Sequence, residues 1–182
     1  IVLLSGSCIP LYSYRDTYKK ITSSDRARIS YKKDPTKKKE KMYFAHQWVI
    51  LNRKTATDYA RLADRKDVKA RTFIKKMRRI YKDNDVIVGN KPVIGLEESD
   101  MHCPDEVYPI NWFIKLYGKN MDKYIKRQMT TYTRWDMDKD PDHPQTFNIK
   151  TVKKYKKSIC GRGHIFARKF NKQAAAYIGM NC

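Results

Sequence analysis

The stretch CPDEVYPINWF, residues 103–113, decides the fold prediction because it joins an acidic pair to an apolar, helix-like run. Asp105 and Glu106 form the pair. Pro109 fits the first turn of the following helix without breaking it, and the helix is expected to end near Gly118. Its buried face is predicted to carry three apolar side chains: Ile110, Phe113 and Ile114.

Outward from this helix, short apolar runs alternate with stretches of helical period. Strands are predicted at residues 1–4, 47–51, 85–89 and, more loosely, 128–135. Helices are predicted at residues 14–21, through residues 59–81, and at residues 149–157. Residues 32–41 are rich in lysine and are predicted to form an exposed loop. Strands that alternate with helices indicate one α/β domain over residues 1–182.

The charge of the chain points to polyanionic partners. Its 182 residues contain 40 Lys and Arg against 19 Asp and Glu, a formal net charge of +21. Nucleic acid, an anionic membrane and nucleotide phosphates all satisfy such a charge. Because 41% of the residues are hydrophobic and 12% aromatic, the chain can build a core and disorder is not expected.

The first residue is Ile1 rather than Met, and the chain opens directly in an apolar run. We interpret this as a strand entered in mid-domain, so we expect an N-terminal part of the domain to be missing. The run is too short for a signal peptide or a membrane span, and no later window reaches spanning length. Any membrane anchor would therefore lie outside this chain.

Four cysteines leave several alternatives open: Cys8, Cys103, Cys160 and Cys182. They allow two disulfides in three connectivities, or free thiols. A zinc site is a further alternative, although the spacing matches no standard zinc module. Its ligands would be His102, Cys103, Cys160 and His164.

Five short motifs occur in a fixed order along the chain: LLSGSCIPLY (3–12), HQWVILNR (46–53), CPDE (103–106), HPQTF (143–147) and FARKF (166–170). This pattern resembles the core-2/I-branching β-1,6-N-acetylglucosaminyltransferase family, closest to the branch typified by plant proteins, with viral or protist homologues. The motifs are similar to the C-terminal part of that family's catalytic domain. The resemblance implies a GT-A-like fold that is N-terminally incomplete. It also implies a UDP-sugar donor, inversion at the anomeric carbon and no divalent metal or other cofactor.

The resemblance assigns roles to individual residues. Glu106 matches the catalytic base, because inverting transfer needs one carboxylate to take the proton of the attacking hydroxyl. Asp105 can cap and orient the same turn. The alternative is that both are ordinary acidic residues favoured by a helix N-terminus. The donor-sugar pocket is implied at His46, Gln47 and Trp48, together with Asp105.

The leaving group implied by the resemblance is UDP, whose negative charge grows in the transition state and is stabilised by fixed cations. Lys169 matches the residue that holds the diphosphate, and Arg168 and Lys150 are the further candidates. In a strand, Arg168 and Lys169 would point to opposite faces. Trp135 lies where the family places an aromatic side chain against the acceptor sugar. The alternative for the three cations is ordinary surface charge.

Asp136-Met137-Asp138 has the form of a metal motif, but it follows the expected donor site and we do not assign a metal to it. The implied partners are UDP-N-acetylglucosamine or another UDP-sugar, and a glycan or glycoprotein acceptor. The resemblance places such an enzyme at a Golgi or other secretory membrane, or in the cytoplasm if the chain is viral.

Two rival functions remain open. One is a truncated family member that binds glycans without catalysis. The other is a basic nucleic-acid-binding protein, which would show steep salt dependence. The chain carries no helix-turn-helix, RNA-recognition or finger motif, and its basic residues are spread along its length, so we expect no nucleic-acid partner.

Overall fold

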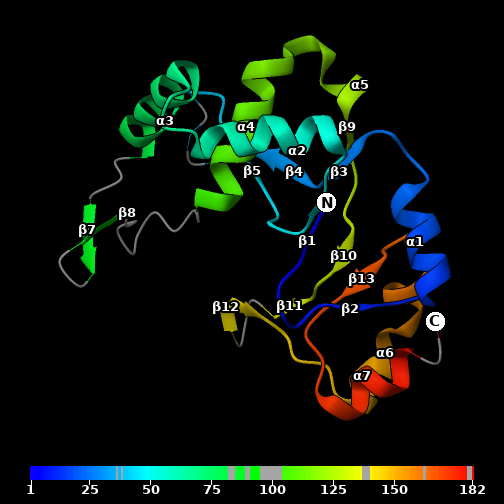
Figure 1. Ribbon diagram of the computed structural model, residues 1–182. Helices are drawn as coiled ribbons and strands as arrows, with labels where there is room; N and C mark the ends of the chain where they lie inside the picture. Colours follow the sequence, from blue (N-terminus) through cyan, green and yellow to red (C-terminus); the bar gives the residue numbers. More distant parts are fainter. Residues whose placement is uncertain are drawn as a thin grey trace.

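The computed structural model describes residues 1–35, 37, 39–81, 85–88, 91–94, 104–136, 140–161, 163–179 and 182 (Figure 1). A four-stranded sheet in the order β1-β6-β3-β9 forms the centre of its larger part. Its strands are β1 (Val2–Leu3), β6 (Val49–Ile50), β3 (Ala27–Ile29) and β9 (Ile125–Arg127). β3 pairs antiparallel with β6 and parallel with β9, so the sheet is mixed.

A second sheet has the order β10-β13-β2, in which β13 pairs parallel with β10 and antiparallel with β2. Its strands are β10 (Thr131–Tyr132), β13 (Phe166–Ala167) and β2 (Ile9–Pro10). Three two-stranded pairs complete the strands described: β4 (Tyr31–Lys33) with β5 (Tyr43–Ala45), β7 (Asp85–Val88) with β8 (Lys91–Ile94), and β11 (Trp135–Asp136) with β12 (Asp140–Pro144).

The helices confirm the α/β prediction: α1 (Tyr14–Thr22), α2 (Arg53–Ala60), α3 (Val68–Tyr81), α4 (Pro104–Tyr117), α5 (Met121–Tyr124), α6 (Ile149–Cys160) and α7 (Lys172–Gly179), with short 3₁₀ turns η1 (Arg61–Ala63) and η3 (Gly118–Asn120). Five of them begin just after residues whose side chains accept a backbone N–H: Ser13, Asn52, Asp67, Asn148 and Asn171. Such caps satisfy backbone N–H donors that the first turn leaves unpaired. The local sequence therefore determines where these helices begin.

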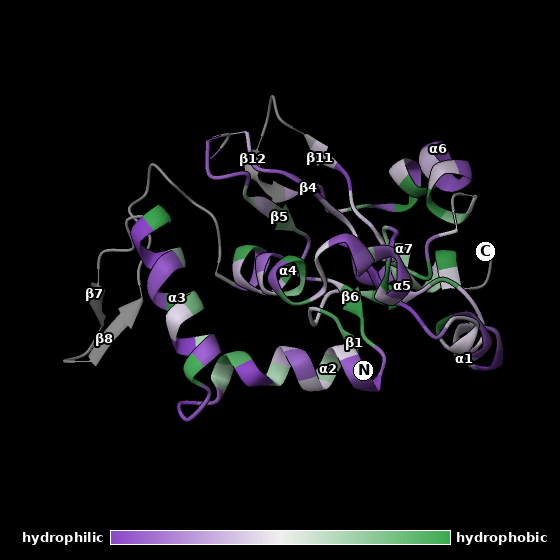
Figure 2. Cartoon of the chain, turned by 90° about the horizontal axis from the view of Figure 1, so that it is seen from above, coloured by the Kyte–Doolittle hydropathy of each residue, from purple (hydrophilic) through white to green (hydrophobic). Residues whose placement is uncertain are grey.

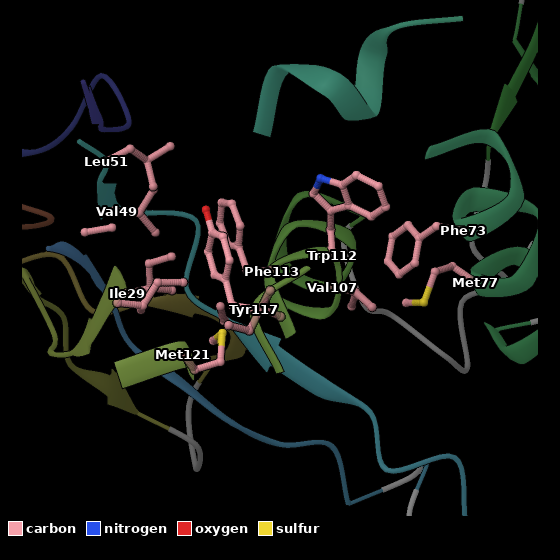
Figure 3. Packing of buried hydrophobic residues seen from close by; sticks show 14 of the residues in the cluster. Ile29, Val49, Leu51, Phe73, Met77, Val107, Trp112, Phe113, Tyr117 and Met121 are labelled. Atoms are coloured by element: carbon pink, nitrogen blue, oxygen red, sulfur yellow. The ribbon is translucent and has the colours of Figure 1, made fainter. Parts of the chain in front are cut away.

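The main core is built around α4. Phe113 and Trp112 leave this helix on different sides, as Figure 3 shows. Phe113 points toward Val49 and the sheet, whereas Trp112 points toward Phe73 of α3. Val107, Ile110, Trp112 and Phe113 are each at most 1% exposed. α4 is therefore buried on more than one side, which explains its nearly continuous apolar sequence.

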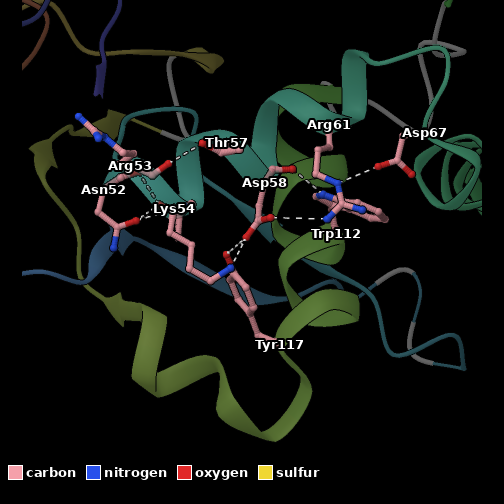
Figure 4. Close-up of polar contacts among 10 residues, drawn as sticks. Asn52, Arg53, Lys54, Thr57, Asp58, Arg61, Asp67, Trp112 and Tyr117 are labelled. Carbon is pink, nitrogen blue, oxygen red and sulfur yellow. Dashed lines mark hydrogen bonds and ion pairs between the residues drawn. The ribbon is translucent and has the colours of Figure 1, made fainter.

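A polar network joins α2 to α4 (Figure 4). Asp58 accepts hydrogen bonds from the Tyr117 hydroxyl at 2.6 Å and from Lys54 Nζ at 2.9 Å. The Asp58 carbonyl accepts the indole N–H of Trp112 at 2.7 Å. These bonds satisfy the polar groups of two large aromatic side chains that α4 buries.

A second core cluster lies at the other end of the molecule, where α6 and α7 pack with β2 and β13. Leu11, Phe147, Val152, Ile159 and Ile178 are its largest fully buried members. Figure 2 places α1 and α6 at this same end, away from α3, with hydrophilic residues along both helices.

Several details of the sequence prediction are wrong. Residues 32–41 are not all exposed loop, because β4 includes Lys32 and Lys33, and Asp34 is 1% exposed and accepts a hydrogen bond from the Tyr81 hydroxyl. Pro109 lies in the second turn of α4 rather than the first, since the helix begins at Pro104. Residues 128–135 are divided between β10 and β11, and the strand predicted for residues 47–51 is confined to β6.

Candidate active site

A cavity of about 150 Å³ lies between the central sheet and the first turns of α4. Its walls come from β1, the segment between β5 and β6, α2 and α4. The lining residues include Leu3, His46, Gln47, Trp48, Tyr59, Asp105, Pro109 and Phe113. The four residues predicted to form the donor-sugar pocket therefore all line one cavity, although they come from two distant parts of the chain.

Glu106 sits in the first turn of α4 and is half-buried. The Gln47 side-chain amide donates a hydrogen bond to its carboxylate, which ties Glu106 to the segment that forms the cavity wall. Burial and then the charge of Asp105 raise the pKa of Glu106 above its ordinary value, and the Gln47 hydrogen bond opposes this rise. A carboxylate with a raised pKa is a stronger base at neutral pH.

Tyr59 is a cavity residue for which the sequence predicted only a place in a helix. It comes from α2 and lines the cavity together with Asp105. Burial and then the charge of Asp105 raise the pKa of Tyr59, so the phenol stays protonated. Its helical spacing to Leu62 and Ala63 gave no signal of this position, because the same period describes an ordinary buried face.

The Trp48 ring contacts both His46 and Arg168. The His46 and Trp48 rings stack with centroids 5.6 Å apart and planes 18° apart. The Arg168 guanidinium carbon lies 4.7 Å from the centroid of the Trp48 ring. Burial and then the charge of Lys32 lower the pKa of His46. The neutral imidazole stacks on Trp48 without adding a second cation, while Arg168 supplies a cation–π contact.

The other two predicted cations, Lys150 and Lys169, lie on segments near Phe147, whose backbone hydrogen bonds join it to the Lys169 segment. The Phe147 N–H donates to the Lys169 carbonyl at 2.7 Å, and the Asn171 N–H donates to the Phe147 carbonyl at 3.0 Å. Lys150 follows in the exposed first turn of α6, and Lys169 is half-buried. β13 ends at Ala167, so the strand alternation expected for Arg168 and Lys169 does not apply. Their backbone segments nevertheless lie beside that of Lys150.

The sequence of this chain matches one known protein family over most of its length. The sequence model of the Core-2/I-Branching enzyme family matches residues 1–158. This chain belongs to that family. The match includes the cavity residues and Glu106, whereas Arg168 and Lys169 lie beyond its end.

A rice protein, "Glycosyltransferase BC10" from Oryza sativa subsp. japonica, is 26% identical to this Core-2/I-branching chain over 171 residues. The alignment covers 81% of this chain and 40% of the rice protein, so the chain spans less than half of that relative's length. No solved structure matches the chain. The resemblance inferred from the five motifs is confirmed, and the mixed α/β architecture agrees with a GT-A-like fold.

Trp135 stands apart from the cavity lining in this Core-2/I-branching chain. It lies in β11, pairs with Pro144 of β12 and is 38% exposed. Such an exposed ring is free to contact a sugar, but none of the contacts described joins it to Glu106. Asp136 ends β11, and the rest of the Asp136-Met137-Asp138 stretch lies outside the described residues.

The zinc alternative is wrong because Cys160 forms a disulfide with Cys182. The Cα atoms of these cysteines are 5.5 Å apart, and the bridge ties the last residue to the end of α6. Cys8 is a free thiol, while His102 and Cys103 lie outside the described residues. Within the part of the chain that the structure describes, no three His, Cys, Asp or Glu side chains are grouped as a metal site. The helices described there include none that is long and apolar enough to cross a membrane.

Proposed function

We propose that this chain carries the catalytic carboxylate of an inverting glycosyltransferase that moves N-acetylglucosamine from UDP-N-acetylglucosamine to a glycan hydroxyl. The observation that supports this most is Glu106, half-buried beside the cavity and hydrogen-bonded to Gln47. Membership of the Core-2/I-branching family adds support, as does the similarity to a protein named as a glycosyltransferase.

In the proposed step, the acceptor hydroxyl oxygen attacks the anomeric carbon of the donor sugar. Its proton passes to the Glu106 carboxylate as the new carbon–oxygen bond forms. The bond from the anomeric carbon to the β-phosphate oxygen breaks on the opposite side, and UDP leaves with the bonding electron pair. One carboxylate suffices because a single displacement inverts the configuration.

Cations would stabilise the departing UDP. Lys169 and Lys150 are proposed to bind the diphosphate, since the Phe147 hydrogen bonds hold their segments side by side. Arg168 contacts Trp48, so it is proposed to link the diphosphate site to the wall of the sugar pocket. Fixed positive charges aimed at a developing anion are an effective way to lower such a barrier. We propose that the reaction needs no divalent metal.

The cavity fits one sugar unit better than a whole nucleotide sugar. Pockets for complete ligands usually measure about 300–1,000 Å³, whereas this cavity measures about 150 Å³. Its mixture of apolar side chains with Gln47, His46 and Asp105 suits the two faces of a sugar ring. We therefore propose that it takes the transferred sugar, with Trp135 contacting the acceptor.

A secretory compartment is the proposed location. The Cys160–Cys182 disulfide supports it, because such bonds persist in oxidising environments.

The test is release of UDP from UDP-N-acetylglucosamine by the purified protein, in the presence of EDTA. Glu106→Gln keeps the shape of the side chain and removes the base, so the rate should fall at least about a hundredfold. Glu40→Gln, at an exposed carboxylate, is the matched control and should keep the parent rate. Equal rates for Glu106→Gln and the parent protein would reject Glu106 as the base, and loss of activity in EDTA would reject metal independence.

A further inference from the structure

The helix α1 carries an exposed aromatic pair that the proposed catalytic site does not use. Tyr14 is 86% exposed and Tyr18 is 59% exposed, although large aromatic side chains usually bury most of their surface. Because they are four residues apart, they lie on the same face of the helix. Their ring centroids are 6.5 Å apart and their planes differ by 26°. The two rings therefore form a nearly continuous platform open to solvent.

Two cations share this platform. An open hollow of about 410 Å³ is lined by Tyr14, Arg15, Tyr18 and Lys19. Both Arg15 and Lys19 are exposed. The only acidic residue of α1, Asp16, accepts a hydrogen bond from the Ser13 hydroxyl at 2.7 Å, at the start of the helix. The hollow thus combines two aromatic faces with two exposed cations.

The platform is fixed to the body of the protein. Thr17, on the inner side of α1, is buried and its hydroxyl donates to the Tyr12 carbonyl at 3.2 Å. Lys20 Nζ lies 4.3 Å from the centroid of the Tyr12 ring, and the Tyr12 hydroxyl donates to the Cys160 carbonyl at 3.4 Å. Because the helix is held in this way, binding to its outer rings does not require the backbone of α1 to become ordered.

The charge around the platform continues onto α6. The Tyr12–Cys160 hydrogen bond brings α1 beside the end of α6, and both views of the fold place the two helices at one end of the molecule. α6 has five lysines and no acidic residue: Lys150, Lys153, Lys154, Lys156 and Lys157. These lysines add to the positive potential at this end of the molecule, which would attract a long polyanion toward the α1 rings.

We propose that α1 is a binding site for a linear anionic polysaccharide, separate from the catalytic cavity. The C–H faces of neighbouring sugar units would stack on Tyr14 and Tyr18, while Arg15 and Lys19 pair with carboxylate or sulfate groups. A polysaccharide is favoured over a nucleic acid because the disulfide indicates an oxidising compartment. The proposal does not depend on transferase activity, since no sugar donor takes part in binding.

The experiment measures the affinity of the purified protein for polygalacturonate, with neutral dextran and poly-dT as comparison polymers. The parent protein should bind polygalacturonate, bind dextran much more weakly, and lose affinity as salt is added. Tyr14→Ala with Tyr18→Ala should weaken polygalacturonate binding about tenfold. Tyr14→Phe with Tyr18→Phe keeps the ring faces and should retain the parent affinity.

Two pairs of substitutions that remove the same charge distinguish binding at α1 from general electrostatic attraction to a basic protein. Arg15→Gln with Lys19→Gln should weaken binding, whereas Lys75→Gln with Lys76→Gln removes two exposed charges on α3 and should have little effect. Equal losses in these two pairs would overturn the proposal, as would no binding by the parent protein. Dextran bound as tightly as polygalacturonate would also overturn it, and poly-dT binding that depends on Tyr14 and Tyr18 would favour a nucleic acid instead.

Discussion

At the scale of single residues, the pKa of Glu106 is subject to opposing effects. Burial and Asp105 raise its pKa, and the hydrogen bond from Gln47 lowers it. A general base is most useful when its pKa approaches the working pH while it remains ionised. Burial, Asp105 and Gln47 together therefore set the pH range in which the proposed base is active.

The pH dependence of activity should report this balance directly. Because the base must be ionised, kcat/KM should rise with pH through the raised pKa of Glu106, above the ordinary value for a glutamate. Gln47→Ala removes the bond that lowers this pKa and should move the acid limb to higher pH. Asp105→Asn removes a charge that raises it and should move the limb to lower pH. If both variants shift the limb in the same direction, the limb does not belong to Glu106.

The sequence predicted which residues line the cavity better than it predicted their contacts. The motifs at residues 46–53 and 103–106 named the cavity residues His46, Gln47, Trp48 and Asp105, because these motifs match the family's donor-sugar segments. Tyr59 and the stacking of Arg168 on Trp48 were not predicted. Both depend on how distant segments pack, and no local pattern encodes that packing.

At the scale of elements, helices were predicted well and short strands poorly. The helical period gave α1 and α6 nearly to their ends, since capping residues and apolar spacing are local signals. The helix predicted through residues 59–81 is wrong in its first half, because the structure divides it into the end of α2, η1 and α3. Strands of two or three residues, such as β10 and β13, are too short to show an alternating pattern. Asp34 was misplaced because its burial depends on Tyr81, which comes 47 residues later.

The contact between α2 and α4 depends on Asp58. Burial alone raises the pKa of Asp58, but hydrogen bonds from Tyr117 and Lys54, with the charges of Lys54 and Arg61, bring it below its ordinary value. Asp58→Asn should lower the free energy of unfolding by about 1–3 kcal/mol. Urea titration would measure this change in the free energy of unfolding. Asp25→Asn, at an exposed carboxylate, is the control and should change it little.

The sign of the pH dependence follows from the lowered pKa. The folded state favours the ionised Asp58, so its stabilisation is present above the unfolded-state pKa of about 3.9 and is lost as the pH falls. The difference between the parent protein and Asp58→Asn should therefore shrink in acid. A difference that stays constant from neutral pH to pH about 3 would contradict this account.

At the scale of the whole molecule, the Cys160–Cys182 disulfide connects the end of α6 to the residue that follows α7 by three positions. The four cysteines alone left the pairing open, because the approach of Cys160 and Cys182 is set by the packing of these helices. The bridge spans 22 residues, and a loop of this size is expected to contribute about 3 kcal/mol by restricting the unfolded chain.

Reduction should therefore destabilise the protein. Urea unfolding of the parent protein should shift to lower urea concentration when dithiothreitol is added, and Cys160→Ser with Cys182→Ser should match the reduced protein with or without it. Cys8→Ser should keep the parent's sensitivity, since Cys8 is a free thiol. Identical unfolding of the oxidised and reduced parent protein would show that the bridge contributes nothing.

Chemical rescue tests the central claim most directly. Glu106→Ala should lose about a hundredfold or more of the transfer rate from UDP-N-acetylglucosamine. Added formate, a small carboxylate that can enter the vacated space, should restore part of that rate, and chloride at the same ionic strength should not. A Glu106→Ala protein that transfers sugar within about twofold of the parent rate would contradict the account, because no base would then be missing.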